Sequence, residues 1–336
     1  MTLSTSSSDH VRPPWRKVWA LVLILSIVIV GSWEALVRQA GLGPEYNDNR
    51  SLWTDARHRL NRHGDNAIAL LGASRLQYAV DVATMSQALD RPVVQLSVEG
   101  TSALALLENL AADPRFHGTV IYSVAPAFTL NSALPRIEAG KQQEWVEYYF
   151  GQSRSRRMEQ SLRLYLQGAL AFRSPDAQLT RVIPSILSSG SLPDRDQKTT
   201  FANRVLHKDY SKVSAEVDEL GMVQFYLENT VPFSKPEFDV ILSYLDTLVL
   251  LLRQKGVDVY FLRLPSSAEV KLLETAFFPR PVFWDVMEQR LDATFIHADD
   301  YPEMAGFMSQ DGSHVDSQHI VDFTNVLMDV LRKNKL

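Results

Sequence analysis

The chain of 336 residues has no cysteine, which excludes disulfides, thiol catalysis and zinc sites built from thiolates. It also lacks an excess of positive charge, since its formal net charge is −5. A nucleic-acid-binding protein needs a basic surface that displaces counterions from phosphates, so we expect no nucleic acid partner. Low-complexity sequence is missing beyond the serine-rich first residues, and the composition is that of a globular protein.

Charged residues are absent from residues 18–33, and the apolar character continues to about residue 37 after a single glutamate. With its flanks the segment reaches the length of about twenty residues that spans a bilayer. Tryptophans stand at both ends, where the interfacial aromatic residues of membrane helices lie. The sequence therefore predicts a transmembrane helix over residues 18–37.

The charges before this segment set its expected orientation. Arg12, Arg16 and Lys17 place a cytoplasmic tail at residues 1–17, so the rest of the chain lies outside the cytoplasmic (inner) membrane, in the periplasm of a cell with two membranes. Two alternatives stay open. One is a cleaved signal peptide with small residues near position 31. The other is a buried core helix, although the segment lacks the polar face that such a helix normally has.

A linker and a short helix are expected at residues 38–64, and after them short apolar runs alternate with helical segments. Strands are expected at residues 67–71, 92–97, 118–124, 256–265 and 293–298. Apolar strands that alternate with helices are typical of a parallel sheet covered on both faces. The sequence therefore predicts an α/β domain over residues 65–336, with ligands at the carboxyl ends of the strands.

The pattern breaks over about residues 130–235, where we expect a helical insertion without a clear strand. Within it, residues 153–173 predict a helix whose apolar face includes Met158, Leu162 and Tyr165, surrounded by arginines. Such a helix can lie on a membrane or dock on a partner. The more common arrangement, a surface helix packed on its own domain, is the one we expect here.

Two polar turns lie at opposite ends of the domain. Ser74 follows the first expected strand in the sequence LLGASR, and Asp311 and His314 occur in the sequence DGSHVD before the last helix, at about residues 317–333. A serine nucleophile needs a base, and the base needs a carboxylate that fixes its tautomer. Ser74, Asp311 and His314 are therefore the expected catalytic triad. A turn serine without catalytic role is the alternative for Ser74, and His319 is the competing base.

These turns resemble the first and last motifs of the SGNH/GDSL hydrolase superfamily, and the order of the elements fits over most of residues 65–333. The resemblance implies a three-layer α/β/α, flavodoxin-like fold. It also implies that Ser74 is the nucleophile, His314 the general base and Asp311 the orienting carboxylate. The backbone N–H groups of Ser74 and Gly100 would form the oxyanion hole. This mechanism needs no metal and no organic cofactor.

The sequence departs from that superfamily in two turns. The third strand ends in SVAP at residues 123–126, without the asparagine that donates to the oxyanion in the family. Ala73 replaces the usual aspartate before the serine, a residue outside the triad. The first departure weakens the expectation of plain esterase activity and favours the polymer-acylating branches, which are looser at this motif.

An exported domain behind one membrane anchor is similar to the proteins that acylate cell-surface polymers, such as those of teichoic-acid D-alanylation and alginate-type O-acetylation. The resemblance implies acyl transfer through acyl-Ser74 to a cell-envelope polysaccharide, beside a multi-spanning membrane O-acyltransferase as partner. An exported carbohydrate esterase is one alternative. A non-catalytic binding partner of such an acyltransferase is another.

Two arginines are candidate substrate-binding residues. Arg75 directly follows the expected nucleophile, and Arg263 lies near the end of the fourth expected strand. Each arginine also has an alternative, purely structural role. Arg75 could pair with a nearby carboxylate, and Arg263 could lie at the surface.

Overall fold

The computed structural model describes residues 15–129, 133–193, 197–212, 214–230, 233–266 and 268–336. The chain divides into two compact units. Unit 1 consists of Met1–Pro44 and Ala169–Arg195, and unit 2 consists of Glu45–Gly168 and Asp196–Leu336.

The predicted membrane segment of unit 1 is one continuous helix, α1, at Trp15–Gln39. This helix is long and apolar enough to cross a bilayer, a property that signal sequences share. Near its end, the carboxylate of Glu34 accepts the backbone N–H groups of Ala171 and Phe172 at 2.9 and 3.0 Å. Unit 1 also contains α9 and two 3-10 turns, at Leu179–Ser189, Ala171–Arg173 and Pro175–Ala177.

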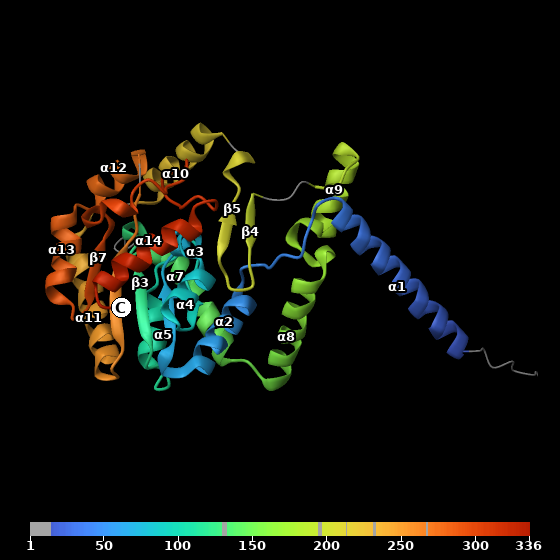
Figure 1. Ribbon diagram of the computed structural model, residues 1–336, viewed down its shortest axis with the longest axis horizontal. Helices are drawn as coiled ribbons and strands as arrows, with labels where there is room; N and C mark the ends of the chain where they lie inside the picture. The colour runs from blue at the N-terminus through green and yellow to red at the C-terminus, as the bar shows by residue number, and fades with distance from the viewer. Residues whose placement is uncertain (1–14, 130–132, 194–196, 213, 231–232, 267) are drawn as a thin grey trace, which may run out of the picture. The chain divides into compact units, whose positions relative to one another are not determined.

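Five strands of unit 2 form one parallel sheet in the order β2-β1-β3-β6-β7. Figure 1 labels β3 and β7 among these strands. The strands are β1 (Ile68–Leu71), β2 (Val93–Gln95), β3 (Thr119–Ser123), β6 (Asp258–Arg263) and β7 (Thr294–His297). All five expected strands are present, somewhat shorter than the apolar runs. Numbered within the sheet, their order is 2-1-3-4-5, which is the flavodoxin-like arrangement.

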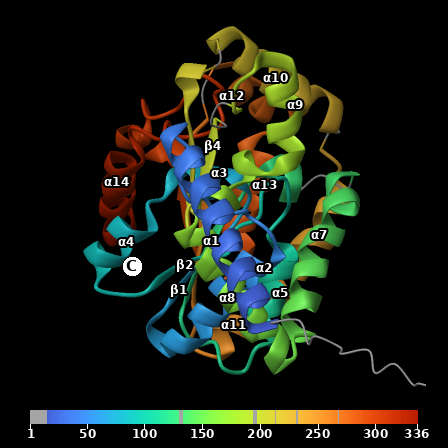
Figure 2. The ribbon, with the colours of Figure 1, turned by 90° about the vertical axis from the view of Figure 1, so that its right-hand side faces the viewer.

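Alternate residues of the strands face two separate clusters of buried apolar side chains. In β1, Ala69 and Leu71 belong to one cluster, and Ile68 and Leu70 belong to the other. The first face is covered by α2 (Arg50–His63), α5 (Leu104–Ala112), α7 (Ala133–Phe150), α11 (Lys235–Gln254) and α13 (Arg280–Arg290). The second face is covered by α3 (Ser74–Ala79), α4 (Val82–Leu89) and α14 (Ile320–Lys333). Figure 2 shows α4 and α14 on one side of the strands and α5 and α7 on the other, which confirms the predicted three-layer α/β/α fold.

The expectation of no strand within residues 130–235 was wrong. β4 (Lys198–Thr200) and β5 (Leu206–Lys208) form an antiparallel hairpin there. The strands have only three residues each, Lys-Thr-Thr in β4 and Leu-His-Lys in β5, which is too few to show the period that identifies strands in a sequence. The turn after β5 delivers side chains to the site described below.

The remaining elements of unit 2 are α helices and 3-10 turns that connect the strands. The α helices are α6 (Pro126–Thr129), α8 (Arg154–Ala169, its last residue in unit 1), α10 (Ala215–Asn229) and α12 (Ala268–Phe277). The 3-10 turns lie at Gly64–Asn66, Tyr210–Lys212, Ala298–Asp300 and Pro302–Met304. Several helices begin at a side-chain cap, as where Asn49 accepts the N–H groups of Ser51 and Leu52 at the start of α2.

Candidate active site

The expected nucleophile lies at the carboxyl end of the central strand β1. After β1 the chain turns through Gly72 and Ala73, and Ser74 is the first residue of α3. A side chain at position 72 would bring its Cβ within 3.0 Å of the Cβ of Ser123, at the end of β3. Glycine is therefore needed for the close approach of the two strand ends. Ala73 is the N-cap residue of α3, and no side chain among the described residues caps this helix.

The three expected triad residues form one chain of hydrogen bonds. Ser74 Oγ lies 2.9 Å from His314 Nε2, and His314 Nδ1 lies 2.9 Å from Asp311 Oδ2. Asp311 and His314 are buried, and Ser74 is half-buried at the wall of a pocket. The competing base, His319, is an exposed residue at the start of α14. The structure thus brings together residues 240 positions apart in the sequence, while their catalytic roles stay predictions.

Both carboxylate oxygens of Asp311 accept several hydrogen bonds. Oδ1 accepts the hydroxyl of Ser309 at 2.8 Å and the backbone N–H groups of Ser313 and His314 at 2.9 Å each. Oδ2 accepts His314 Nδ1 and the hydroxyl of Tyr210, which also lies at 2.9 Å. Tyr210 follows the hairpin strand β5, and nothing in its local sequence identifies it as part of a site.

These contacts decide the protonation of the site. Burial alone would raise the pKa of Asp311, but the hydrogen bonds from His314 and from the backbone N–H of Ser313 hold that pKa well below its usual range. An ionised Asp311 only accepts hydrogen bonds, so Nδ1 of His314 donates to it. His314 Nε2 is then free to accept the proton of Ser74, which is the arrangement a general base requires.

Tyr78 of α3 covers one side of the His314 ring. The two ring centroids are 4.6 Å apart at an interplanar angle of 53°. The Tyr78 hydroxyl donates to Glu99 at 3.2 Å, and burial together with the charge of Glu99 raises the pKa of Tyr78. A neutral tyrosine held in this way restricts rotation of the imidazole and leaves its Nε2 directed at Ser74.

Gly100, the second expected oxyanion donor, follows β2 and lines the same pocket as Ser74 and His314. Its φ of +68° lies in the left-handed region that favours glycine. Ala125, beyond the end of β3, also lines this pocket and carries no polar side chain. The structure therefore places Gly100 beside the nucleophile, and its role as a donor stays a prediction.

The pocket at Ser74 has a volume of about 170 Å³. Its apolar lining residues include Phe128 of α6 and Met222 and Phe225 of α10. A cavity of about 150 Å³ with apolar walls holds a ring as large as benzene. The pocket at Ser74 therefore has room for a short acyl group against an apolar wall formed by Phe128, Met222 and Phe225. No local sequence pattern identifies this wall.

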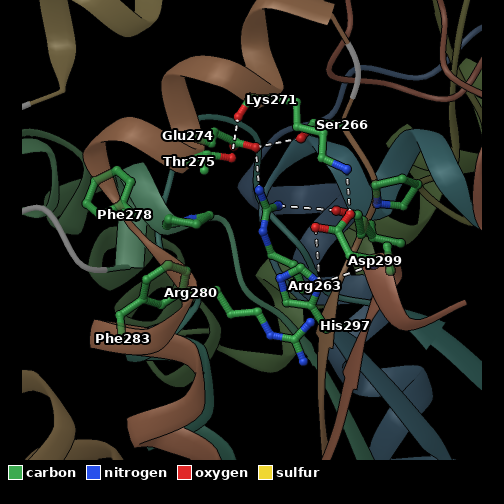
Figure 3. Close-up of a pocket in the computed structure, with 14 residues that line it drawn as sticks. Arg263, Ser266, Lys271, Glu274, Thr275, Phe278, Arg280, Phe283, His297 and Asp299 are labelled. Atoms are coloured by element: carbon green, nitrogen blue, oxygen red, sulfur yellow. Dashed lines mark hydrogen bonds and ion pairs between the residues drawn. The ribbon is translucent and has the colours of Figure 1, made fainter.

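Arg75 and Arg263 share one buried carboxylate, that of Glu274 in α12. Arg75 Nη2 lies 2.8 Å from Glu274 Oε1, and Arg263 Nη2 pairs with Oε2. Figure 3 shows the Arg263 side chain reaching toward Glu274 in a second, smaller pocket of about 90 Å³. Arg75 thus pairs with a nearby carboxylate, as its structural alternative predicted. Arg263 is buried, so the surface position considered for it was wrong.

This ion-pair cluster also connects to the catalytic turn. Arg75 Nε donates to the hydroxyl of Ser313 at 3.0 Å, next to His314. The Tyr226 hydroxyl donates to Glu274 at 2.7 Å and accepts Arg75 Nη2 at 2.7 Å. Burial would raise the pKa of Glu274, but the charges of Arg263 and Arg75 lower it to about 2. Arg75 therefore ties the helix that carries the nucleophile to the turn that carries the base.

No group of three or more His, Asp or Glu side chains among the described residues could hold a metal ion. No protein-family model matches the sequence, and no curated protein matches it. Among solved structures, the chain is similar to TesA, known from the "Crystal Structure of TesA". The two are 12% identical over 80% of this chain and 98% of the TesA chain, with a TM-score of 0.37. A likeness at this level establishes neither a family nor an activity, so the chemistry has to be inferred from the geometry.

Proposed function

We propose that the chain is an SGNH-type serine enzyme that catalyses acyl transfer. The observation that carries the proposal is the chain of hydrogen bonds from Ser74 through His314 to Asp311 at the wall of an apolar pocket. Nucleophile, base and orienting carboxylate lie within hydrogen-bond distance, and the carboxylate is ionised.

In the first half of the reaction, Ser74 Oγ attacks the acyl carbonyl while its proton passes to His314 Nε2. The bond from the carbonyl carbon to the leaving oxygen or sulfur then breaks, and His314 returns the proton to that atom. In the second half, His314 removes a proton from an acceptor hydroxyl, whose oxygen attacks the carbonyl of acyl-Ser74. The bond from the carbonyl carbon to Ser74 Oγ then breaks, and His314 returns the proton to Oγ. The acyl group packs against the wall formed by Phe128, Met222 and Phe225.

The negative charge on the carbonyl oxygen needs hydrogen-bond donors. The backbone N–H groups of Ser74 and Gly100 are the proposed pair, each contributing about 3 kcal/mol to the transition state. The end of β3 supplies Ala125 to the pocket in place of the amide side chain of the superfamily. The proposed oxyanion hole therefore has two donors.

The proposed acceptor is a hydroxyl group of a cell-envelope polysaccharide outside the cytoplasmic membrane. The apolar helix α1 supports this location, because it is suited to anchor the domain at a membrane. The resemblance to polymer-acylating proteins supports the acceptor and adds a multi-spanning O-acyltransferase as proposed partner. Hydrolysis of the same acyl-Ser74 by water would make the chain an esterase, which differs only in the second half of the reaction.

Labelling with a fluorophosphonate probe tests the nucleophile in the full-length protein in detergent. The wild type and the exposed control His319→Ala should label, whereas Ser74→Ala and His314→Ala should not. A folded wild-type protein that fails to label would contradict the proposal and favour a non-catalytic binding partner. Incubation with an acyl ester and an oligosaccharide then separates transfer from hydrolysis by the ratio of acylated sugar to free acid.

A further inference from the structure

Helix α8 turns its apolar face away from the protein. At about 3.6 residues per turn, Met158, Leu162 and Tyr165 share one face of the helix. These side chains are 70%, 59% and 72% exposed, while Gln160 and Gln167 on the other side are buried. A helix packed on its own domain has the opposite arrangement, with apolar residues inward. The expectation that this apolar face packs on the domain was therefore wrong.

Cationic side chains surround this apolar face. Arg154 lies at its start, and Arg157 and Arg163 lie on its two sides, all three exposed. Glu159 pairs with Arg163, and it is the one acidic residue of the helix. The chain as a whole carries a net charge of −5, so this basic surface is a local feature.

The basic surface continues beyond the helix. A pocket of about 340 Å³ borders α8 and is lined by Arg62 of α2, Arg115 and Arg157. The acidic residue that lines it, Asp55, pairs with Arg59 at 3.2 Å. Arg115 pairs with Asp113 at 3.0 Å. An anionic group at the edge of α8 would therefore meet the guanidinium groups of Arg62 and Arg157.

We propose that α8 lies in the interface of an anionic lipid membrane. Met158, Leu162 and Tyr165 enter the boundary between headgroups and acyl chains, and the arginines contact the lipid phosphates. This arrangement is independent of the chemistry at Ser74. A position of α8 at the membrane fits a chain that is anchored by α1. Helix α1 ends at Gln39 and α2 begins at Arg50. The ten residues between these helices span at most about 40 Å when extended. Such a tether gives the domain a high effective concentration at the membrane surface.

A protein surface is the competing occupant of this apolar face. In unit 1, helix α9 exposes Leu179, Ile183 and Leu187, which are four residues apart and lie on one face of that helix. Lipid is favoured for α8 because its apolar residues are flanked by arginines, which match lipid phosphates and oppose burial against an apolar helix.

The absence of cysteine allows a test with one fluorescent label per chain. The full-length protein with Met158→Cys, labelled with an environment-sensitive dye, is inserted into vesicles of phosphatidylcholine and phosphatidylglycerol. Val240→Cys on α11 is a matched control, because Val240 is also 70% exposed. We expect brominated acyl chains to quench the dye at position 158 by about twofold or more and to leave the dye at position 240 unchanged. Replacing Arg154 and Arg157 by glutamine should reduce the ratio of docked to undocked protein about fivefold per arginine.

Two results would overturn the proposal. A dye at position 158 that stays as water-exposed as the one at position 240 would show that α8 does not meet the membrane. A dye that is shielded from water but not quenched by brominated lipid would show that a protein surface covers α8. Equal thermal unfolding of the labelled variants ensures that neither result comes from a misfolded protein.

Discussion

Replacing Asp311 by asparagine tests how the site fixes the histidine tautomer. Oδ1 of Asp311 accepts three hydrogen bonds, from Ser309, from the N–H of Ser313 and from the N–H of His314. An asparagine would therefore keep its carbonyl oxygen at this position. Its NH2 group would take the place of Oδ2 and donate to Nδ1 of His314. The proton of the imidazole then moves to Nε2, which can no longer accept the proton of Ser74.

The expected loss follows from this tautomer. In a serine protease with the same carboxylate-to-amide exchange, kcat falls about 10⁴-fold. This factor corresponds to about 5 kcal/mol of transition-state stabilisation. The fold should survive, because the three hydrogen bonds to the carbonyl oxygen are kept. Removing the whole side chain, as in Asp311→Ala, would instead leave these buried donors without their acceptor and cost additional stability.

The rate of fluorophosphonate labelling at Ser74 measures the effect without knowledge of the natural substrate. Asp311→Asn should label about 10³-fold to about 10⁴-fold more slowly than the wild type, with an unchanged circular dichroism spectrum. A variant that labels within about tenfold of the wild-type rate would show that Asp311 does not set the tautomer of His314, and the proposed mechanism would fail.

Three further changes test other parts of the site. Glu274→Gln removes a carboxylate whose pKa is about 2 in the folded protein. This lowered pKa means that the ionised carboxylate stabilises the folded wild type at neutral pH, and the wild type loses that stabilisation as the pH falls from about 4.3 toward about 2. The variant should be less stable by about 3 kcal/mol at neutral pH and show a shallower acid unfolding by circular dichroism, and equal acid unfolding of the two proteins would contradict this. Phe225→Ala removes a ring from the apolar wall and so enlarges the pocket. The kcat/KM for a longer acyl ester should then rise about tenfold relative to acetyl esters, because each added CH2 group that is buried contributes about 0.8 kcal/mol. An unchanged dependence of kcat/KM on acyl chain length would argue against an acyl-binding wall. Tyr210→Phe removes one hydrogen bond to Asp311 and should slow labelling about tenfold, whereas an unchanged rate would assign Tyr210 a purely structural role.

The sheet and the contacts among Ser74, His314 and Asp311 could be predicted because each strand and each turn has its own local signal. β1 and β3 are buried along their whole length and β6 is buried except at its first residue, so these strands appear as apolar runs. Asp311 and His314 contact each other within one turn, so their spacing in the sequence already contains their geometry. The position of Ser74 follows from the rule that parallel strands present their carboxyl ends at one edge.

The pocket wall and the ion-pair cluster could not be predicted in this way. Arg75 and Glu274 are 199 positions apart, and neither has a neighbouring residue that identifies the other. Phe225 lies on α10, a helix whose amphipathic pattern is weak, and Tyr210 follows a hairpin too short to recognise. The outward apolar face of α8 shows a further limit, because a helical period indicates which residues share a face but not whether that face meets the protein.

The separation of Ser74 and His314 by 240 positions has a consequence for biosynthesis. A ribosome completes β1 and α3 long before it reaches β7, the turn with His314 and helix α14. Throughout that interval Ser74 has no base, because His314 has not yet been synthesised. A chain terminated before position 314 is therefore chemically silent, and the capacity for acyl transfer proposed here arises only in molecules whose carboxyl-terminal segment has folded onto the sheet.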